Sequence, residues 1–229
     1  MTRRSSEGGH GSTQDGQASH RSEPKTLSDA LGAIGELNQE LLTVLVLAAR
    51  RDSAQSFPLA DSLRPQFENL TSAQIGAISR CGVLLADAGF TDTARWQNAD
   101  LAHESRVDAD TGGQWLAQDH AIAFGFAVLM LAWHVVHTTP RVSGVLLGMS
   151  KAVLFHYRKL GIHGLVAMAQ KGPRWIRPRW IESPDVWSGI IDVATDPISH
   201  ESSKISVHCL KLSAAHSPRF MASVYSRWP

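Results

Sequence analysis

The sequence predicts a mostly helical fold made of two diverged helical units, preceded by a disordered tail. Three observations support this prediction. Apolar residues recur at helical spacing near the start of the folded part, a second apolar segment covers residues 121–136, and the two halves match when the chain is shifted by 90 residues. Of the 229 residues, 43% are hydrophobic and 19% are charged, which is enough apolar material to bury a core.

The first unit is expected to start after a polar tail. Residues 1–25 are rich in Ser, Gly, Gln, His and charge, so we expect them to be disordered. A long helix then runs from Thr26 to near Arg51, because one stripe of apolar residues recurs at helical spacing. The stripe comprises Leu27, Leu31, Ile34, Leu37, Leu41, Leu42, Leu45 and Ala48.

Shorter elements follow in the first half. A short helix is expected over residues 59–67, with Pro65 disturbing it. The next helix is capped by Thr71 or Ser72 and ended by Gly82. Residues 83–90 form an extended segment or a last short element, and residues 91–118 form a polar connector with room for a short helix.

The second half opens with an apolar helix over residues 120–137, stopped by Pro140. Its uncharged run of 16 residues is shorter than the ~20 needed to cross a bilayer, so a buried core helix is expected rather than a membrane span. Short helices follow over 149–157 and 162–170, then an extended RWIRPRW segment and a helix starting at Pro184. Residues 202–212 are compatible with a strand, and nothing in the pattern places them.

The two halves of the sequence match at apolar and aromatic residues that are expected to pack in a core. At an offset of 90, the small helix after Leu70 aligns with the one after Leu160, and Phe90 aligns with Trp180. With one inserted residue, Trp96 aligns with Trp187. The alternative is chance agreement between two helical segments. A repeat predicts a tail (1–25), a first unit (26–110), a second unit (111–195) and an unassigned C-terminal tail (196–229), with the two units packed as a pseudo-dimer.

Three consecutive segments carry a family resemblance. LNQELLTVLVLAARRD, LTSAQIGAIS and GVLLADAGF resemble, in order and spacing, the flagellar transcriptional regulator FlhD family. The second half resembles it more loosely, through LLGMS and GPRWIRPRW. The resemblance implies two FlhD-like helical units, DNA binding together with a zinc-containing FlhC-like partner, and activation of flagellar or mobile-element operons. It implies no covalent dimer link, because the family's intersubunit cysteine position falls near Ala86 and Ile176.

The chemistry-bearing residues do not indicate an enzyme. His134 and His137 lie three residues apart, but no third ligand stands at a metal-site spacing, so we expect neither a metal nor another cofactor. Cys81 and Cys209 are too few for a disulfide framework, and no base is placed to activate either as a nucleophile. Their small number, with no secretory signal, predicts a reducing cytoplasmic compartment and no membrane association.

Charge is distributed unevenly between the halves. Residues 120–181 contain no acidic residue, whereas acidic and basic residues balance in residues 42–96. Basic side chains can neutralise DNA phosphates. We therefore predict a DNA-binding surface that comprises Arg158, Lys159, Lys171, Arg174, Arg177 and Arg179. The alternatives are a solvated basic face, or arginines stacked on tryptophans inside the fold.

The sequence thus favours a DNA-associated transcription regulator that works with a partner protein, and a homo-oligomer is one possible assembly. A second hypothesis is a protein-interaction adaptor or anti-activator that does not itself bind DNA. A third is an enzyme with an unrecognised site. DNA affinity that weakens with salt favours the first hypothesis, and a stable protein complex without DNA affinity favours the second.

Overall fold

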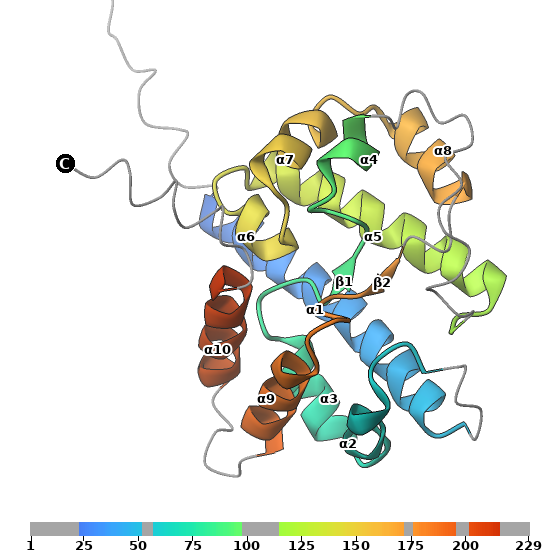
Figure 1. The fold of residues 1–229 in the computed structure, drawn as a ribbon. Helices are drawn as coiled ribbons and strands as arrows, with labels where there is room; N and C mark the ends of the chain where they lie inside the picture. The colour runs from blue at the N-terminus through green and yellow to red at the C-terminus, as the bar shows by residue number, and fades with distance from the viewer. Residues whose placement is uncertain (1–22, 52–56, 98–114, 172–175, 196–201, 216–229) are drawn as a thin grey trace, which may run out of the picture.

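The computed structural model describes residues 23–51, 57–97, 115–171, 176–195 and 202–215, and most of them are helical (Figure 1). The first half contains α1 (Glu23–Ala49), the 3-10 helix η2 (Asp61–Leu63), α2 (Arg64–Glu68), α3 (Ser72–Ser79), β1 (Ala86–Asp87) and α4 (Thr93–Gln97). The second half contains α5 (Gln118–Thr138), α6 (Ser143–Leu147), α7 (Lys151–Tyr157), α8 (Ile162–Lys171), β2 (Arg177–Pro178), α9 (Pro184–Thr195) and α10 (Ser202–Ala215). The mostly helical class is therefore confirmed.

Local sequence signals explain where several helices begin. Thr71 is the N-cap of α3 and forms a capping box, in which its hydroxyl accepts from the Gln74 backbone and the Gln74 side chain accepts from the Thr71 backbone. Ser150 caps α7 by accepting from the Val153 N–H, 3.2 Å away. Helix α9 starts at Pro184, as expected from a proline that needs no N–H in the first turn.

Three expectations require correction, and one helix was missed. Helix α1 begins at Glu23, slightly before Thr26, and the rest of the predicted tail lies outside the described residues. Pro65 lies at the start of α2 and does not disturb it, because a proline in the first turn gives up no helical hydrogen bond. Helix α6 was not anticipated. Residues 202–215 form helix α10 and not a strand, because Ile205 and Cys209, four residues apart, are both buried on one face.

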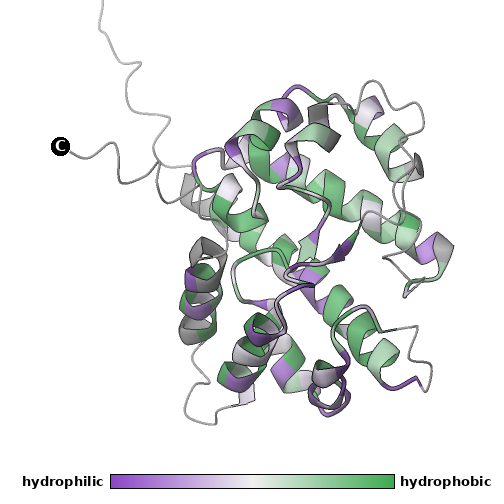
Figure 2. Ribbon diagram, viewed as in Figure 1, coloured by the Kyte–Doolittle hydropathy of each residue, from purple (hydrophilic) through white to green (hydrophobic). Residues whose placement is uncertain are grey.

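The core lies between the two long helices, which contact one another (Figures 1 and 2). Leu41, Leu42 and Leu45 of α1 are no more than 1% exposed, and Val128, Ala132 and Val135 of α5 are fully buried. By length and composition alone, Thr26–Ala49 and Asp119–Thr138 are apolar enough to cross a membrane, and 44% of the apolar window in each is buried inside the protein. The apolar faces of both helices thus contribute to this core.

The elements of the two halves follow in a similar order. Helix α3 begins at Ser72 and α8 at Ile162, 90 residues later, and each packs on the long helix of its own half. In contrast, α4 and α9 each pack against a short helix of the other half. Helix α4 of the first half contacts α7 of the second, and α9 of the second half contacts η2 of the first (Figure 1).

Two short strands join the halves at the centre. β1 pairs with β2 in antiparallel orientation, with Ala86 opposite Pro178 and Asp87 opposite Arg177. The Arg179 N–H extends the pairing by donating to the Leu85 carbonyl over 2.7 Å. The expected extended segments after Val83 and around Pro178 therefore meet one another, because each leaves backbone groups that the other satisfies.

Candidate nucleic-acid interface

Arg158 and Lys159, two of the predicted DNA-binding residues, are exposed directly after α7. Arg158 is the C-cap of this helix, and its backbone N–H donates to the carbonyls of the preceding turn. The Lys159 ammonium lies 4.0 Å from the centroid of the Phe155 ring, a cation–π contact on a ring that is itself 58% exposed. The two side chains thus present positive charge to solvent from the second half.

The Arg177 side chain is also exposed, but it carries an ion pair. Its Nε lies 3.3 Å from Oδ2 of Asp87, on the opposite strand. Asp87 is more buried than Arg177, and its Oδ1 accepts a hydrogen bond from the Phe90 N–H over 2.9 Å. Because the carboxylate already offsets part of its charge, Arg177 offers a weaker phosphate contact than Arg158.

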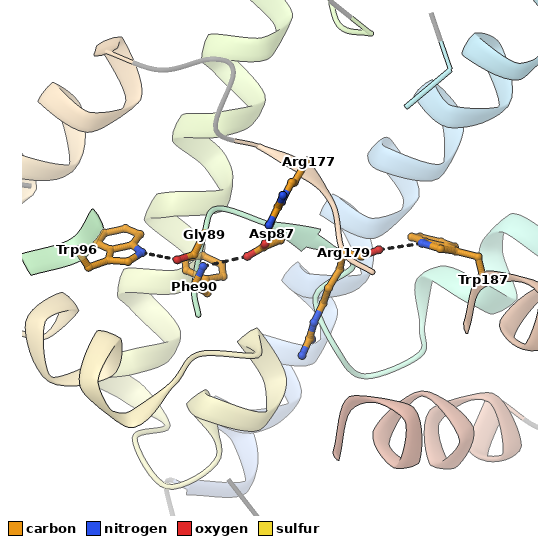
Figure 3. Close-up of polar contacts among 7 residues, drawn as sticks. All are labelled: Asp87, Gly89, Phe90, Trp96, Arg177, Arg179 and Trp187. Atoms are coloured by element: carbon orange, nitrogen blue, oxygen red, sulfur yellow. Dashed lines mark hydrogen bonds and ion pairs between the residues drawn. The ribbon is translucent and has the colours of Figure 1, made fainter. Parts of the chain in front are cut away.

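Arg179 differs from the expected position. Only 9% of Arg179 is exposed, and Figure 3 shows its side chain lying apart from the contact between Arg177 and Asp87. The guanidinium donates to the Leu84 carbonyl, 3.4 Å away, and fills the space beside Gly148, where any Cβ would collide with it. Gly148 has a φ of +70°, so glycine provides both the backbone conformation and the room. Arg179 is therefore a core arginine in this conformation and not part of the exposed surface.

The remaining two predicted residues cannot be placed. Lys171 ends α8, and its side chain lies outside the described residues. Arg174 lies in a segment outside them altogether. The described part of the predicted surface accordingly consists of Arg158 and Lys159, with Arg177 engaged in its ion pair.

A buried polar cluster surrounds Arg179. Burial lowers the pKa of the guanidinium, and the charge of Asp87 and then those of Cys81 and Cys209 oppose this shift. Cys81 and Cys209 are both free thiols with no exposed surface. A hydrogen bond from the Cys209 thiol lowers the pKa of Cys81, although burial acts in the opposite direction. Sequence reasoning missed this pair, because the two cysteines are 128 positions apart and share no motif.

Asn38 is the second feature that sequence reasoning missed. It is fully buried on α1, and its amide group donates to the carbonyls of Val83 at 2.8 Å and Ser79 at 3.1 Å. Its Oδ1 accepts from the Leu85 N–H at 2.8 Å. Asn38 therefore fixes the segment between α3 and β1 against α1. Its position within an otherwise apolar stripe is a signal that identifies it, since a buried amide needs partners.

The two histidines of α5 lie apart from this cluster. His134 and His137 are exposed, and His137 Nδ1 lies 2.7 Å from the Trp133 carbonyl. Within the described ranges, no group of three or more His, Cys, Asp or Glu side chains is arranged to hold a metal ion. The His137 side chain therefore makes a local contact at the end of its own helix, and His134 accepts a hydrogen bond there from the Thr138 hydroxyl through its backbone carbonyl.

Comparisons with known proteins add no relative. No model of a known protein family matches the chain. No curated protein matches it significantly. No solved structure matches it significantly either. Hypotheses about its function consequently depend on its own residues.

Proposed function

We propose that this chain is a non-enzymatic, DNA-associated transcription-regulator subunit, built from two FlhD-like units that pack as a pseudo-dimer. In this proposal it acts in the cytoplasm with an FlhC-like partner protein, and it regulates flagellar or mobile-element operons. The architecture and the DNA contact are supported by separate observations.

Reciprocal tryptophan contacts support the pseudo-dimer. The Trp96 indole N–H donates to the Gly89 carbonyl at 2.8 Å, and the Trp187 indole N–H donates to the Arg179 carbonyl at 2.8 Å (Figure 3). Gly89 and Arg179 are 90 positions apart. The same local hydrogen bond thus recurs at the repeat offset, which is expected when one unit has been duplicated.

The tryptophan ring of each half also packs on an aromatic ring of the other half. Trp96 packs on Tyr157 with ring centroids 4.9 Å apart, and Trp187 packs on Phe67 at 5.6 Å. Phe67 and Tyr157 are again 90 positions apart, so each half inserts its tryptophan against the short helix of the other. An interface related by a two-fold axis has this reciprocity, in which residue i contacts j and j contacts i.

The exposed cations after α7 are the observation that carries the proposed DNA contact. Arg158 and Lys159 lie within residues 120–181, which contain no acidic side chain to offset them. At the repeat offset, the first half has Glu68 and Asn69 in their place. The packing that the two halves have in common therefore does not require positive charge at these two positions. The charge is found in the second unit alone, so it is suited to a role specific to that unit.

Salt-dependent binding to a labelled mixed-sequence DNA duplex tests the proposal. Each phosphate contact contributes ~0.9 to the slope of log affinity against log salt, so Arg158→Ala/Lys159→Ala should weaken binding and make the slope shallower by ~1.8. The matched control is Arg51→Ala/Lys211→Ala, which removes the same charge from exposed positions on other elements. An equal loss in both variants would indicate only net charge, and contradict a defined surface.

A protein-interaction adaptor is the second candidate, and exposed apolar residues next to the same cations favour it. Phe155 is 58% exposed and Ile162 is 51% exposed. Large exposed apolar side chains beside charges are common in protein-binding surfaces. If a folded Arg158→Ala/Lys159→Ala variant retains the affinity and slope of the parent chain, the DNA proposal fails and the adaptor is favoured.

A further inference from the structure

The two cysteines of the chain meet where α10 packs on the rest of the protein. Cys81 follows α3, and Cys209 lies in α10. Helix α10 contacts α3, and the Ser206 hydroxyl donates to the Arg80 carbonyl at 3.1 Å. Ser206 lies just under one turn before Cys209, on the same side of the helix. This contact therefore brings Cys209 against Cys81, and both thiols are fully buried.

The surroundings of the two sulfur atoms differ and favour thiolate formation on one of them. The Cys209 thiol donates to the Cys81 sulfur, and this lowers the pKa of Cys81 while it raises that of Cys209. The Asn38 amide lies 3.7 Å from the Cys81 sulfur as a further donor. The charge of Arg179 lowers the pKa of both thiols. The Cys81 thiol also donates to the Val83 carbonyl at 3.3 Å, so Cys81 is the sulfur with hydrogen-bonding neighbours on several sides. Since the thiolate is the reactive form, we assign the first attack to Cys81.

Helix α10 is suited to local opening, which the buried thiols need before they can react. Of its side chains that the structure describes, Ile205 and Cys209 are buried, whereas Val207 and Leu210 are 49% and 37% exposed. It contacts α3, α6 and α9, and the described residues of the first half contain no helix that follows α4 as α10 follows α9. An element with few buried apolar contacts opens at a smaller free-energy cost than the core.

We propose that Cys81 and Cys209 are a redox-modification site, whose intrachain disulfide locks α10 onto the body of the protein. The oxidant is a small-molecule disulfide such as oxidised glutathione. The Cys81 thiolate attacks one sulfur of this disulfide and releases one glutathione thiol. The Cys209 thiolate then attacks the Cys81 sulfur of the mixed disulfide and releases the second glutathione. Two electrons pass from the cysteine pair to the oxidant, and the two thiol protons end on the two glutathione molecules.

The disulfide would have two physical effects. It closes a loop of more than one hundred residues, and cross-links over long loops restrict the unfolded chain most. It also prevents α10 from leaving its site on α3. In a reducing compartment the bond forms only transiently, which is the usual behaviour of redox-sensing pairs there. The proposal goes beyond transcription regulation and does not depend on DNA binding.

The test is equilibration of the full chain in buffers of increasing oxidised-to-reduced glutathione ratio, followed by alkylation and mass measurement. We expect a monomeric product that has lost two hydrogen atoms and resists alkylation, with a Tm higher by roughly 5–15 °C. Amide exchange in α10 should slow in the same sample. The single variants Cys81→Ser and Cys209→Ser should instead stop at one bound glutathione.

Several outcomes would overturn the proposal. One is a wild-type chain that stays fully reduced at every ratio, both in native buffer and at a sub-denaturing urea concentration that opens α10. Another is a wild-type chain that accumulates only mixed or intermolecular disulfides. The wild-type measurement decides the matter even if a serine variant fails to fold, because it needs no substitution.

Discussion

Asp87 and Arg177 face one another across the β1–β2 pair and are joined by a 3.3 Å ion pair between Oδ2 and Nε. They are separated by 90 positions, which is also the offset at which the two halves of the sequence match. In a symmetric dimer, a residue that meets its own copy lies on the two-fold axis. The pair therefore occupies the place where an axis relating the two proposed units would pass.

The two partners of this ion pair should differ in their effect on stability. Arg177→Ala should cost less than about 1 kcal/mol, because its side chain is 54% exposed and the pair is screened by solvent. Asp87→Ala should cost about 1–3 kcal/mol, because it also removes the acceptor of the Phe90 N–H. Urea unfolding of both variants checks this order. If the arginine variant is as unstable as the aspartate variant, Asp87 stabilises the fold mainly through the ion pair and not through its hydrogen bond with the Phe90 N–H.

Trp96 and Trp187, which each pack against the other half, should contribute equally to the free energy of unfolding. Replacing Trp96 or Trp187 with Phe keeps most of the buried ring but removes the indole hydrogen bond, and each change should cost about 1 kcal/mol. Replacing either with Ala should cost about 3–5 kcal/mol, because both are at most 3% exposed. Chemical denaturation gives the values. If Ala is tolerated at one position and not at the other, the two tryptophans occupy matching places but do not contribute equally to stability.

Tyr157 should make the fold sensitive to alkali. Burial raises its pKa well above the usual value of about 10, because the phenolate would lie in the core and the phenol donates to the Leu129 carbonyl. A raised pKa favours the protonated group in the folded state. This contribution is complete below pH 10 and is lost as pH rises above 10 toward the folded pKa.

The measurement is the free energy of unfolding of the parent chain and of Tyr157→Phe between pH 7 and about 11. Near neutrality the variant should be less stable by about 0.5–1.5 kcal/mol, the usual contribution of one hydrogen bond. Above pH 10 the difference should shrink or change sign, since the phenylalanine has no proton to lose. A constant difference across this range would mean that Tyr157 does not titrate with unfolding.

The two long helices offer a matched test of the core. Leu45 of α1 is fully buried, and Leu131 of α5 is 9% exposed. Leu45→Ala should cost about 3–5 kcal/mol and Leu131→Ala about 2–3 kcal/mol, because the loss grows with the cavity left behind. Leu47→Ala is the control, since Leu47 is 51% exposed and should change stability by less than about 0.5 kcal/mol. A control as unstable as Leu45→Ala would place the apolar stripe on the wrong face.

Local sequence patterns predicted most of the helices. The apolar spacing in α1 and α5, the N-cap at Thr71 or Ser72 and the proline at the start of α9 each act within a few neighbouring residues, so they can be read without knowing the fold. The offset of 90 also came from the sequence, because it depends on which residue types recur. The assignment of these units to the FlhD family and the DNA contact remain proposals.

Tertiary structure alone decided the features that depend on distant partners. The sequence of α10 shows no sustained apolar period and is compatible with a strand, and its burial against α3 and α9 selects the helix. Arg179 belongs to a basic segment, yet the space beside Gly148 takes its side chain into the core. Cys81 and Cys209 become neighbours only when α10 packs. Arg179 and Gly148 lie 31 positions apart, and Cys81 and Cys209 lie 128 apart. No local pattern encodes which distant surface will cover a residue.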